Sequence, residues 1–258
     1  MENINKYESQ SVAADVALFS AINTQKHRRQ PEFHLQILLI KRGNDPFQGM
    51  WALPGGFVGE GETALSAAIR ELKEETGVEF DSSYIKQLYT YTEPDRDPRS
   101  RVFGVAYLAL SDTASASVQA GDDASEAEWF EAAYSREEDI ASLTLESGEI
   151  TIQAQLAYGD GEEPHIRLNT GLAFDHAKII AMALEYLRLE VDCSDISLNF
   201  LPETFTLPEL QSIYEVIKGE KIHQAAFRRK FADYIAPTGV YTETNSRYPA
   251  LLYKSAKQ

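Results

Sequence analysis

Short apolar runs separated by polar loops fill the first part of the chain. Runs rich in β-branched and aromatic side chains are typical of strands. Four are predicted as strands: residues 12–20, 35–41, 84–92 and 101–110. Residues 63–76 instead repeat apolar positions at helical spacing, and Gly77 follows where a helix-ending glycine belongs. A polar segment, 112–130, is expected to lead into one more strand, so the pattern indicates an α+β unit over residues 1 to about 150.

The pattern changes near Thr170, where a long helix is predicted with Asp175 as a possible cap. Its apolar positions recur at helical spacing: Ala177, Ile180, Ala181, Leu184 and Leu187. Thr206 and Glu209 then form a capping box for a second helix, which Gly219 would end.

A third helix is expected over about residues 223–234, followed by two short strands around a polar turn. Helix, turn, helix and hairpin together outline a winged helix. We therefore predict two domains, one over residues 1–160 and a winged-helix domain over residues 170–258.

Charge is distributed unevenly along the chain. The formal net charge is −16, which on its own disfavours nucleic acid as the main partner. Residues 218–258, however, hold eight Lys and Arg against three acidic residues, a local charge of +5 that leaves −21 in residues 1–217. An acidic body with a basic tail indicates two separate tasks.

Several classes of protein are disfavoured by the sequence. It contains no apolar run of about 20 residues that could span a membrane, and its first residues do not read as an export signal. The single cysteine, Cys193, excludes an internal disulfide and a multi-cysteine zinc site. The five histidines show no metal or catalytic spacing. A cytoplasmic protein without a membrane partner is expected.

The segment "RELKEETG" concentrates three carboxylates on the predicted helix. At about 100° per residue, Glu74 and Glu75 lie near −60° and +40° from Glu71, so all three share one face. They could form a solvated face. However, like charges at this spacing repel, and hard oxygen ligands suit Mg²⁺ or Mn²⁺. A cation site is therefore a candidate.

The surrounding residues extend this motif over 23 positions. Gly56 is followed after five residues by Glu62, after seven more by Arg70-Glu71-Leu72, after one by Glu74-Glu75, and after one by Gly77-Val78. Every fixed position of the Nudix box is present, and the chain resembles the Nudix hydrolases over about residues 10–150. The resemblance implies an α/β/α sandwich with a mixed sheet and cleavage of nucleoside diphosphate derivatives with Mg²⁺ or Mn²⁺.

By position, the resemblance also implies the metal ligands: Glu71, Glu74, Glu75 and the carbonyl group of Gly55. Arg70 would orient the acidic cluster, and Glu62 would support it. Glu62, Arg70 and Glu75 are accordingly candidate catalytic residues. The general base would come from a later loop, where Glu126 or Glu128 is the candidate. The alternative for that loop is a solvated acidic segment.

Candidate substrate contacts lie on both sides of the box. Arg96, Arg99 and Arg101 could grip phosphate, or could be held by aspartates in an ordinary turn. Phe47 and Trp51 could stack on an adenine, or could simply pack. These stretches resemble the Nudix branch of ADP-ribose pyrophosphatases and Nudix-related regulators of NAD metabolism, which implies an ADP-ribose-like ligand.

The C-terminal part resembles the winged-helix domain of those regulators, and residues 172–180 resemble their linker helix. DNA contacts are expected on the third helix and on the hairpin, and the candidates are Arg228, Arg229, Lys230 and Arg247. The alternative is a winged helix used only for dimerisation. A regulator of this kind would be a homodimer on operator DNA.

Two functions remain open. Many such regulators carry a degenerate Nudix box, whereas the box here is intact, which favours catalysis. The leading hypothesis is therefore a Mg²⁺-dependent hydrolase that converts ADP-ribose to AMP and ribose 5-phosphate. The alternative is a transcriptional regulator whose Nudix domain senses ADP-ribose or a related nucleotide.

Overall fold

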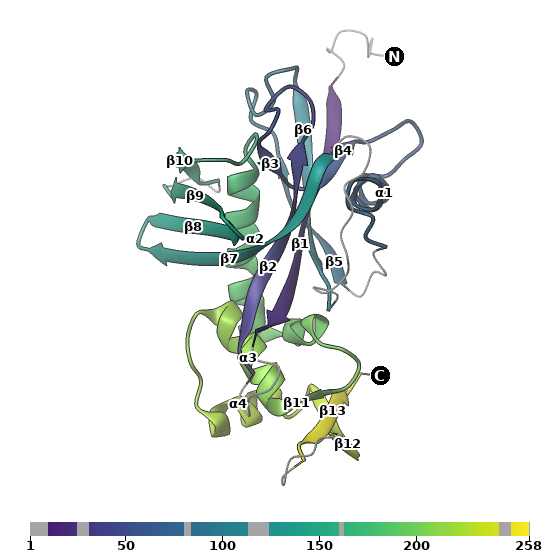
Figure 1. Cartoon of the computed structure of the whole chain (residues 1–258), viewed down its shortest axis with the longest axis vertical. Helices are drawn as coiled ribbons and strands as arrows, with labels where there is room; N and C mark the ends of the chain where they lie inside the picture. Colours follow the sequence, from purple (N-terminus) through teal and green to yellow (C-terminus); the bar gives the residue numbers. More distant parts are fainter. Residues whose placement is uncertain are drawn as a thin grey trace, which may run out of the picture.

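A mixed β-sheet forms the centre of the protein, seen in a computed structural model that describes residues 10–24, 31–79, 84–112, 124–159, 163–242 and 249–257 (Figure 1). Its strands are β1 (Ser11–Asn23), β2 (Phe33–Arg42), β3 (Trp51–Ala52), β4 (Gly55–Phe57), β5 (Tyr84–Tyr91), β6 (Val102–Leu110), β7 (Ala124–Glu137), β8 (Ile140–Ser147), β9 (Ile150–Ala157) and β10 (His165–Asn169). Their order is β10-β9-β8-β7-β2-β1-β6-β5, with β3 on β2 and β4 on β1. The β1–β6 pair is parallel and the other pairs are antiparallel, so the predicted mixed sheet is confirmed.

Two helices cover the two faces of this sheet. Helix α1 (Ala64–Thr76) shares one hydrophobic cluster with Val16 and Leu18 of β1. Helix α2 (His176–Cys193) shares the other cluster with Ala17 and Phe19. The faces alternate because successive side chains of a strand point to opposite sides. The expected α/β/α sandwich is therefore present.

Helix α1 has the limits that its sequence predicts. The Thr63 side chain accepts a hydrogen bond from the Ser66 N–H, and the Ser66 hydroxyl accepts one from the Thr63 N–H, which makes a capping box. Gly77 ends the helix with φ of 69°, a left-handed conformation that favours glycine. These caps fix where the carboxylates of the motif stand relative to the sheet.

The C-terminal part is a winged helix, as expected. Its elements are the 3₁₀ helix η2 (Ile196–Phe200), β11 (Phe205–Thr206), α3 (Leu207–Lys218), α4 (Gln224–Phe231), β12 (Ile235–Tyr241) and β13 (Leu251–Ser255). The three strands pair in the order β11-β13-β12. The capping box of Thr206 with Glu209 and the left-handed Gly219 are both confirmed.

The core is continuous between the sheet and the winged helix. One cluster of buried side chains runs from Phe19 of β1 through Leu184 of α2 to Ile213 of α3 and Phe231 of α4. The Ser212 hydroxyl of α3 also accepts a hydrogen bond from the Phe33 N–H of β2. The winged helix is thus packed against the end of the sheet and is not attached only through a linker (Figure 1).

The structure differs from the sequence prediction at several elements. The short strands β3, β4 and β11 were not predicted, and β8, β9 and β10 extend the sheet beyond the strands that were predicted. Helix α4 ends at Phe231, three residues before the expected limit. Asp175 stands at the cap position of α2, but its carboxylate makes no cap hydrogen bond because Arg96 holds it. Among the described residues, no helix combines the length and the apolar character needed to cross a membrane.

Candidate functional site

A cavity of about 400 Å³ opens beside the C-terminal half of α1. Segments distant in sequence build its wall. β1, β4 and α1 contribute Asp15, Gly55, Gly56, Glu71 and Glu75. The end of β2 contributes Arg42, and the loop after β5 contributes Arg96 and Arg99. Phe174 and His176, at the start of α2, complete it. The wall therefore carries several charges of each sign.

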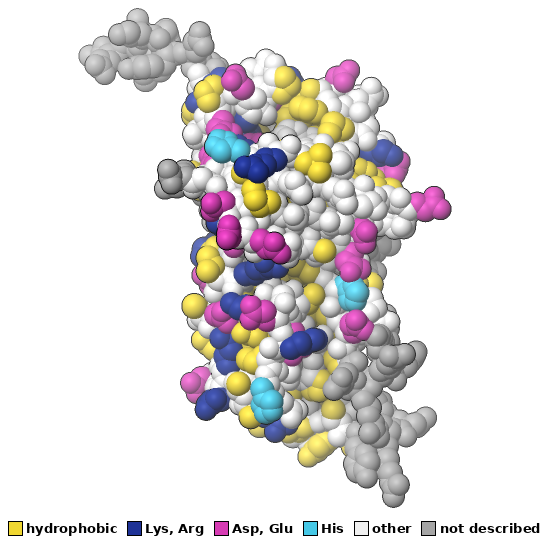
Figure 2. Space-filling view, turned by 90° about the vertical axis from the view of Figure 1, so that its left-hand side faces the viewer, with side chains coloured by type: hydrophobic (Ala, Val, Ile, Leu, Met, Phe, Trp, Pro, Cys, Tyr) yellow, Lys and Arg dark blue, Asp and Glu magenta, His cyan; other side chains and the backbone are white. Residues whose placement is uncertain are grey.

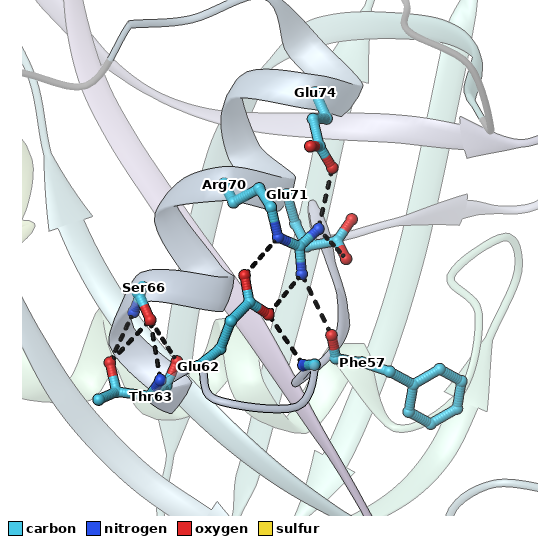
Figure 3. Close-up of polar contacts among 8 residues, drawn as sticks. Phe57, Glu62, Thr63, Ser66, Arg70, Glu71 and Glu74 are labelled. Atoms are coloured by element: carbon cyan, nitrogen blue, oxygen red, sulfur yellow. Dashed lines mark hydrogen bonds and ion pairs between the residues drawn. The ribbon is translucent and has the colours of Figure 1, made fainter.

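Arg70 is the centre of a carboxylate cluster at the edge of this cavity (Figure 3). Its guanidinium donates to Glu62 at 2.7 and 3.0 Å, to Glu71 at 2.8 Å and to Glu74 at 2.9 Å. A fifth hydrogen bond, to the Phe57 carbonyl oxygen, is 3.3 Å long. The hydrogen bonds from Arg70, together with the Gly59 N–H, lower the pKa of Glu62 to about 2. Arg70 thus links Glu62, Glu71 and Glu74, and the catalytic roles of Arg70 and Glu62 stay predictions.

Glu75 points inward from α1 and is 8% exposed. Its carboxylate accepts a hydrogen bond of 2.8 Å from the Gly55 N–H. Burial raises the pKa of Glu75 to about 8, and the charges of Glu71 and Asp15 act in the same direction. Crowded carboxylates of this kind gain stability in the ionised form when a cation lies between them.

Of the three carboxylates predicted as metal ligands, two line the cavity. These are Glu71 and Glu75, whereas the Glu74 side chain is 57% exposed and turned to Arg70 (Figure 3). Among the residues that the structure describes, no group of three or more His, Cys, Asp or Glu is arranged to hold a metal ion. Glu71 and Glu75 offer the hard oxygen donors that a divalent cation needs, while Glu74 shares the Arg70 Nη1 with Glu71. The ligand roles of these residues and of the Gly55 carbonyl stay predictions.

Two glycines let the backbone approach these groups closely. A Cβ on Gly55 would lie 2.5 Å from the Ala14 carbonyl oxygen and 2.7 Å from the Asp15 carboxylate. A Cβ on Gly56 would collide with the Glu71 carboxylate. Any larger residue would displace the floor of the cavity, so the glycines of the motif have a direct steric role.

Arg96 forms a buried ion pair behind the cavity. Its guanidinium donates two hydrogen bonds to Asp175, 2.8 and 2.9 Å long, and lies 3.8 Å from the Asp15 carboxylate. Gly104 of β6 leaves room for that guanidinium. Burial raises the pKa of Asp15 to about 7, against the opposing attraction of Arg96, and Asp175 adds to the rise.

His176 is a site residue that the sequence did not reveal. Its Nδ1 accepts a hydrogen bond of 2.9 Å from the Leu53 N–H, which fixes the ring, and Nε2 lies 3.8 Å from the Asp15 carboxylate. Burial, with the charges of Arg96 and Arg42, lowers the pKa of His176 to about 3, so the ring is neutral. Histidine spacing gave no signal, because its partners lie more than a hundred residues away in the sequence.

Two arginines and an aromatic ring lie close together in the cavity wall. The Arg42 guanidinium lies 4.9 Å from the centre of the Phe174 ring, and the Arg99 guanidinium 5.6 Å from it. Arg99 also covers Phe57 at 5.0 Å and is bound to Asp97 at 2.7 Å, as the Asp–Arg turn alternative expected. Its contact with phosphate stays a prediction. Phe174 has φ of 50°, a conformation unusual for phenylalanine.

Other predicted contacts lie elsewhere. Trp51 is 5% exposed and packs edge-on against Phe130 in the core. Phe47 packs edge-on against Phe174, beside the cavity rather than in its wall. Arg101 stacks on Phe103 and is absent from the cavity wall.

The two candidate bases are exposed on β7. Glu126 is paired with Lys41 at 2.9 Å, and Glu128 accepts a hydrogen bond from the Ser147 hydroxyl at 2.8 Å. Neither lines the cavity. Their role as base stays a prediction.

The four predicted DNA contacts do not all lie on the exposed surface of the described residues. Arg228 and Arg229 are exposed on α4. Lys230 instead turns inward and donates to Asp192 of α2 at 3.0 Å. Arg247 lies outside the described residues. On the face drawn in Figure 2, basic and acidic side chains are interspersed, so that view shows no single basic patch.

Comparisons with known proteins match two separate parts of the chain. The profile of the NUDIX domain matches residues 16–142, and that of the NrtR DNA-binding winged helix domain matches residues 197–255. The chain is 32% identical to the "ADPR responsive transcriptional repressor NtrR" of Acinetobacter baylyi, over 98% of this chain and 84% of that protein. It is 50% identical to an ADP-ribose pyrophosphatase of Methanocaldococcus jannaschii, over 37% of this chain and 54% of that protein.

Solved structures show the same architecture. A MutT/nudix family protein from Enterococcus faecalis superposes with a TM-score of 0.76 at 30% identity, covering 98% of this chain and 89% of that one. Shewanella oneidensis NrtR complexed with a 27mer DNA superposes with a TM-score of 0.65 at 30% identity, covering 95% and 93%.

Proposed function

The chain belongs to the Nudix family and has an NrtR-type winged-helix domain after its Nudix domain; from this we propose that it is a DNA-binding transcriptional regulator whose Nudix cavity binds ADP-ribose or a related nucleoside diphosphate. The intact Nudix box favoured hydrolysis as the leading hypothesis. Regulation now has the stronger support, because the similarity to a repressor extends over 98% of the chain. The similarity to a pyrophosphatase covers only 37%.

The ligand class is supported by the cavity. Arg42 and Arg99 supply fixed positive charge on one wall, and guanidinium groups bind phosphate oxygens in pairs. Phe174 lies against both arginines and offers an apolar surface for a sugar or a base. Glu71 and Glu75 would repel a diphosphate directly, so a divalent cation such as Mg²⁺ would lie between them and the ligand. The name of the A. baylyi relative specifies ADP-ribose among such ligands.

The DNA partner is supported by the exposed arginines of α4, the observation that carries the proposal. Arg228 and Arg229 project from a folded winged helix that is similar to that of a protein solved on DNA. A homodimer would place two such helices on a two-fold symmetric operator. Light scattering of the free protein and of its DNA complex tests that stoichiometry.

The experiment is a binding titration with a labelled duplex from the region upstream of the chain's own gene. Binding should weaken with salt, by a slope of about 0.9 per phosphate contact on logarithmic axes. ADP-ribose with Mg²⁺ should change the affinity for this duplex and leave the affinity for a scrambled duplex unchanged. A protein that binds both duplexes equally, or ignores ADP-ribose, would overturn the proposal.

Hydrolysis is the second candidate, favoured by the complete Nudix box. Arg70 holds Glu71 beside the cavity, and Gly55 orients Glu75 toward it, so the chain's own residues present two carboxylates to a bound diphosphate. A divalent cation at these carboxylates would neutralise phosphate charge and activate a water molecule. Chromatography of ADP-ribose incubated with Mg²⁺ and the protein would show AMP and ribose 5-phosphate.

The Glu75→Gln variant separates true turnover from contamination. Turnover by the wild type that is lost in Glu75→Gln would establish the hydrolase, whereas equal turnover by both proteins would refute it. Glu126→Gln and Glu128→Gln, measured in the same assay, test whether either carboxylate is the base.

A further inference from the structure

Helix α2 connects the two functional units directly. It contains 18 residues, about 27 Å at 1.5 Å per residue, and runs along the sheet to the winged helix (Figure 1). Its first residue, His176, lines the cavity. The polar contacts at its two ends are made to different units. The first turn contacts the segments that build the cavity, and the last turn contacts α3 and α4.

The first turn of α2 is held by three polar contacts. Asp175, directly before the helix, binds the Arg96 guanidinium through two hydrogen bonds. The Nδ1 atom of His176 accepts the Leu53 N–H. Lys178 pairs with Glu93 in the loop that also carries Arg96. Arg96, Leu53 and His176 all line the cavity, so the cavity wall and the start of α2 form one unit.

The middle of α2 offers no flexible joint. Ten of its residues are buried, among them Ile180, Leu184 and Leu187. Glu185 accepts a hydrogen bond from the Tyr134 hydroxyl, and Arg188 donates to the Tyr134 carbonyl oxygen on β7. A close-packed interior transmits displacement instead of absorbing it.

The last turn of α2 ends in a single carboxylate that contacts both helices of the winged helix. Asp192 accepts a hydrogen bond of 2.8 Å from the Tyr214 hydroxyl of α3 and pairs with Lys218 of the same helix. Lys230 of α4 donates to the Asp192 carboxylate at 3.0 Å and to its carbonyl oxygen at 2.8 Å. Lys230 is adjacent to Arg229, so Asp192 sets the position of the exposed arginines.

We propose that α2 carries the ligand state of the cavity to the winged helix, with Asp192 as the positioning residue at its far end; this rests on the proposed function. The physical cause lies at Arg96, a buried cation between Asp175 and Asp15. A diphosphate in the cavity adds negative charge beside this guanidinium and competes with Asp175 for it. A shift of Asp175 moves the start of α2, and Asp192 passes the displacement to α3 and α4.

The test measures coupling in the full-length protein. Affinity for the upstream duplex is determined with and without saturating ADP-ribose, and the ratio of the two is the coupling. The wild type should show a ratio of at least about fivefold, and Asp192→Asn should bring it close to one. Affinity of the free protein for ADP-ribose should stay within about twofold, because Asp192 lies one helix length from the cavity. Linkage requires the DNA to change ADP-ribose affinity by the same ratio.

Two further variants make the result specific. Tyr214→Phe removes only the hydroxyl that donates to Asp192 and keeps the buried ring, so it should reduce the coupling while the protein stays folded. Glu203→Gln removes the same charge as Asp192→Asn from an exposed position before β11, and should leave the coupling unchanged.

The outcomes distinguish the two proposals. A wild type that fails to bind the duplex overturns the proposed function, and the role of α2 with it. A wild type that responds to ADP-ribose, with Asp192→Asn and Tyr214→Phe responding equally well, overturns the role of Asp192 alone. If Glu203→Gln lost coupling to the same extent, the loss would be due to the change in charge, and the role of Asp192 would also be refuted.

Discussion

Replacing Arg96 with leucine should destabilise the protein strongly and in a pH-dependent manner. The side chain is 4% exposed, and its partner Asp175 is 6% exposed. Leucine fills part of the volume but leaves Asp175 and Asp15 without their common cation. The loss of stability therefore comes from the two buried carboxylates left without a cation more than from the lost contact.

The size of the effect follows from this burial. Removing one partner of a buried, doubly hydrogen-bonded ion pair costs about 3–5 kcal/mol. Folded domains are stable by about 5–15 kcal/mol, so Arg96→Leu should lose a large part of the total at pH 8. At pH 5 the penalty should be smaller, because Asp15, with a pKa of about 7, is then protonated and needs no cation.

Urea unfolding followed by circular dichroism at pH 8 and pH 5 provides the measurement. Asp175→Asn, which keeps the shape and one hydrogen-bond acceptor, is the matched control and should cost about 1.5–3 kcal/mol. Combined with Arg96→Leu, it should cost less than the two single changes added together. A loss below about 1 kcal/mol for Arg96→Leu, equal at both pH values, would show that the buried pair is not what holds this end of α2.

Three further predictions concern the same elements. Gly104→Ala would place a Cβ 2.5 Å from the Arg96 guanidinium carbon, and should cost about 1–3 kcal/mol in urea unfolding, with little cost in an Arg96→Leu background. The pKa of His176 is about 3 in the folded state and about 6.5 in the unfolded state. Below pH 6.5 the unfolded state therefore binds a proton that the folded state does not, and the free energy of unfolding falls. From pH 7 to pH 5 the wild type should lose about 2 kcal/mol more of this free energy than His176→Gln. Arg228→Ala should weaken duplex binding and reduce the salt slope by about one, whereas Lys230→Met should leave that slope unchanged because Lys230 is bound to Asp192.

Local signals predicted much of this molecule. Some signals depend only on residues close together in the sequence, so they can be recognised without a structure. They are the capping box of Thr206 with Glu209, the helix-ending Gly77 and the spacing of the Nudix box. The apolar positions of α2 were predicted for the same reason, and they are buried. The strands β8 and β9 also had a local signal, the alternation of apolar residues around Gly148, whose φ is 55°.

The cavity could not be predicted in the same way. Asp175 looked like a cap because its position before an apolar helix is typical of one, but a partner 79 residues away binds it instead. His176 accepts a hydrogen bond from Leu53, 123 residues away, and no sequence periodicity can predict such a contact. Trp51 had left two roles open, because an aromatic residue near the box is equally suited to a ligand or to the core, and the structure packs it in the core.

The shared core changes how the intact Nudix box should be understood. If the winged helix were attached by a loose linker, the two units could act independently, and a complete box would argue only for hydrolysis. Here the start of α2 is part of the cavity wall, and its end holds both helices of the DNA-binding unit. Any ligand that displaces Arg96 therefore acts on the winged helix whether or not it is later cleaved. Cleavage would set how long the ligand remains, and binding alone would set the DNA affinity, so the two proposed functions would be separate steps at one cavity.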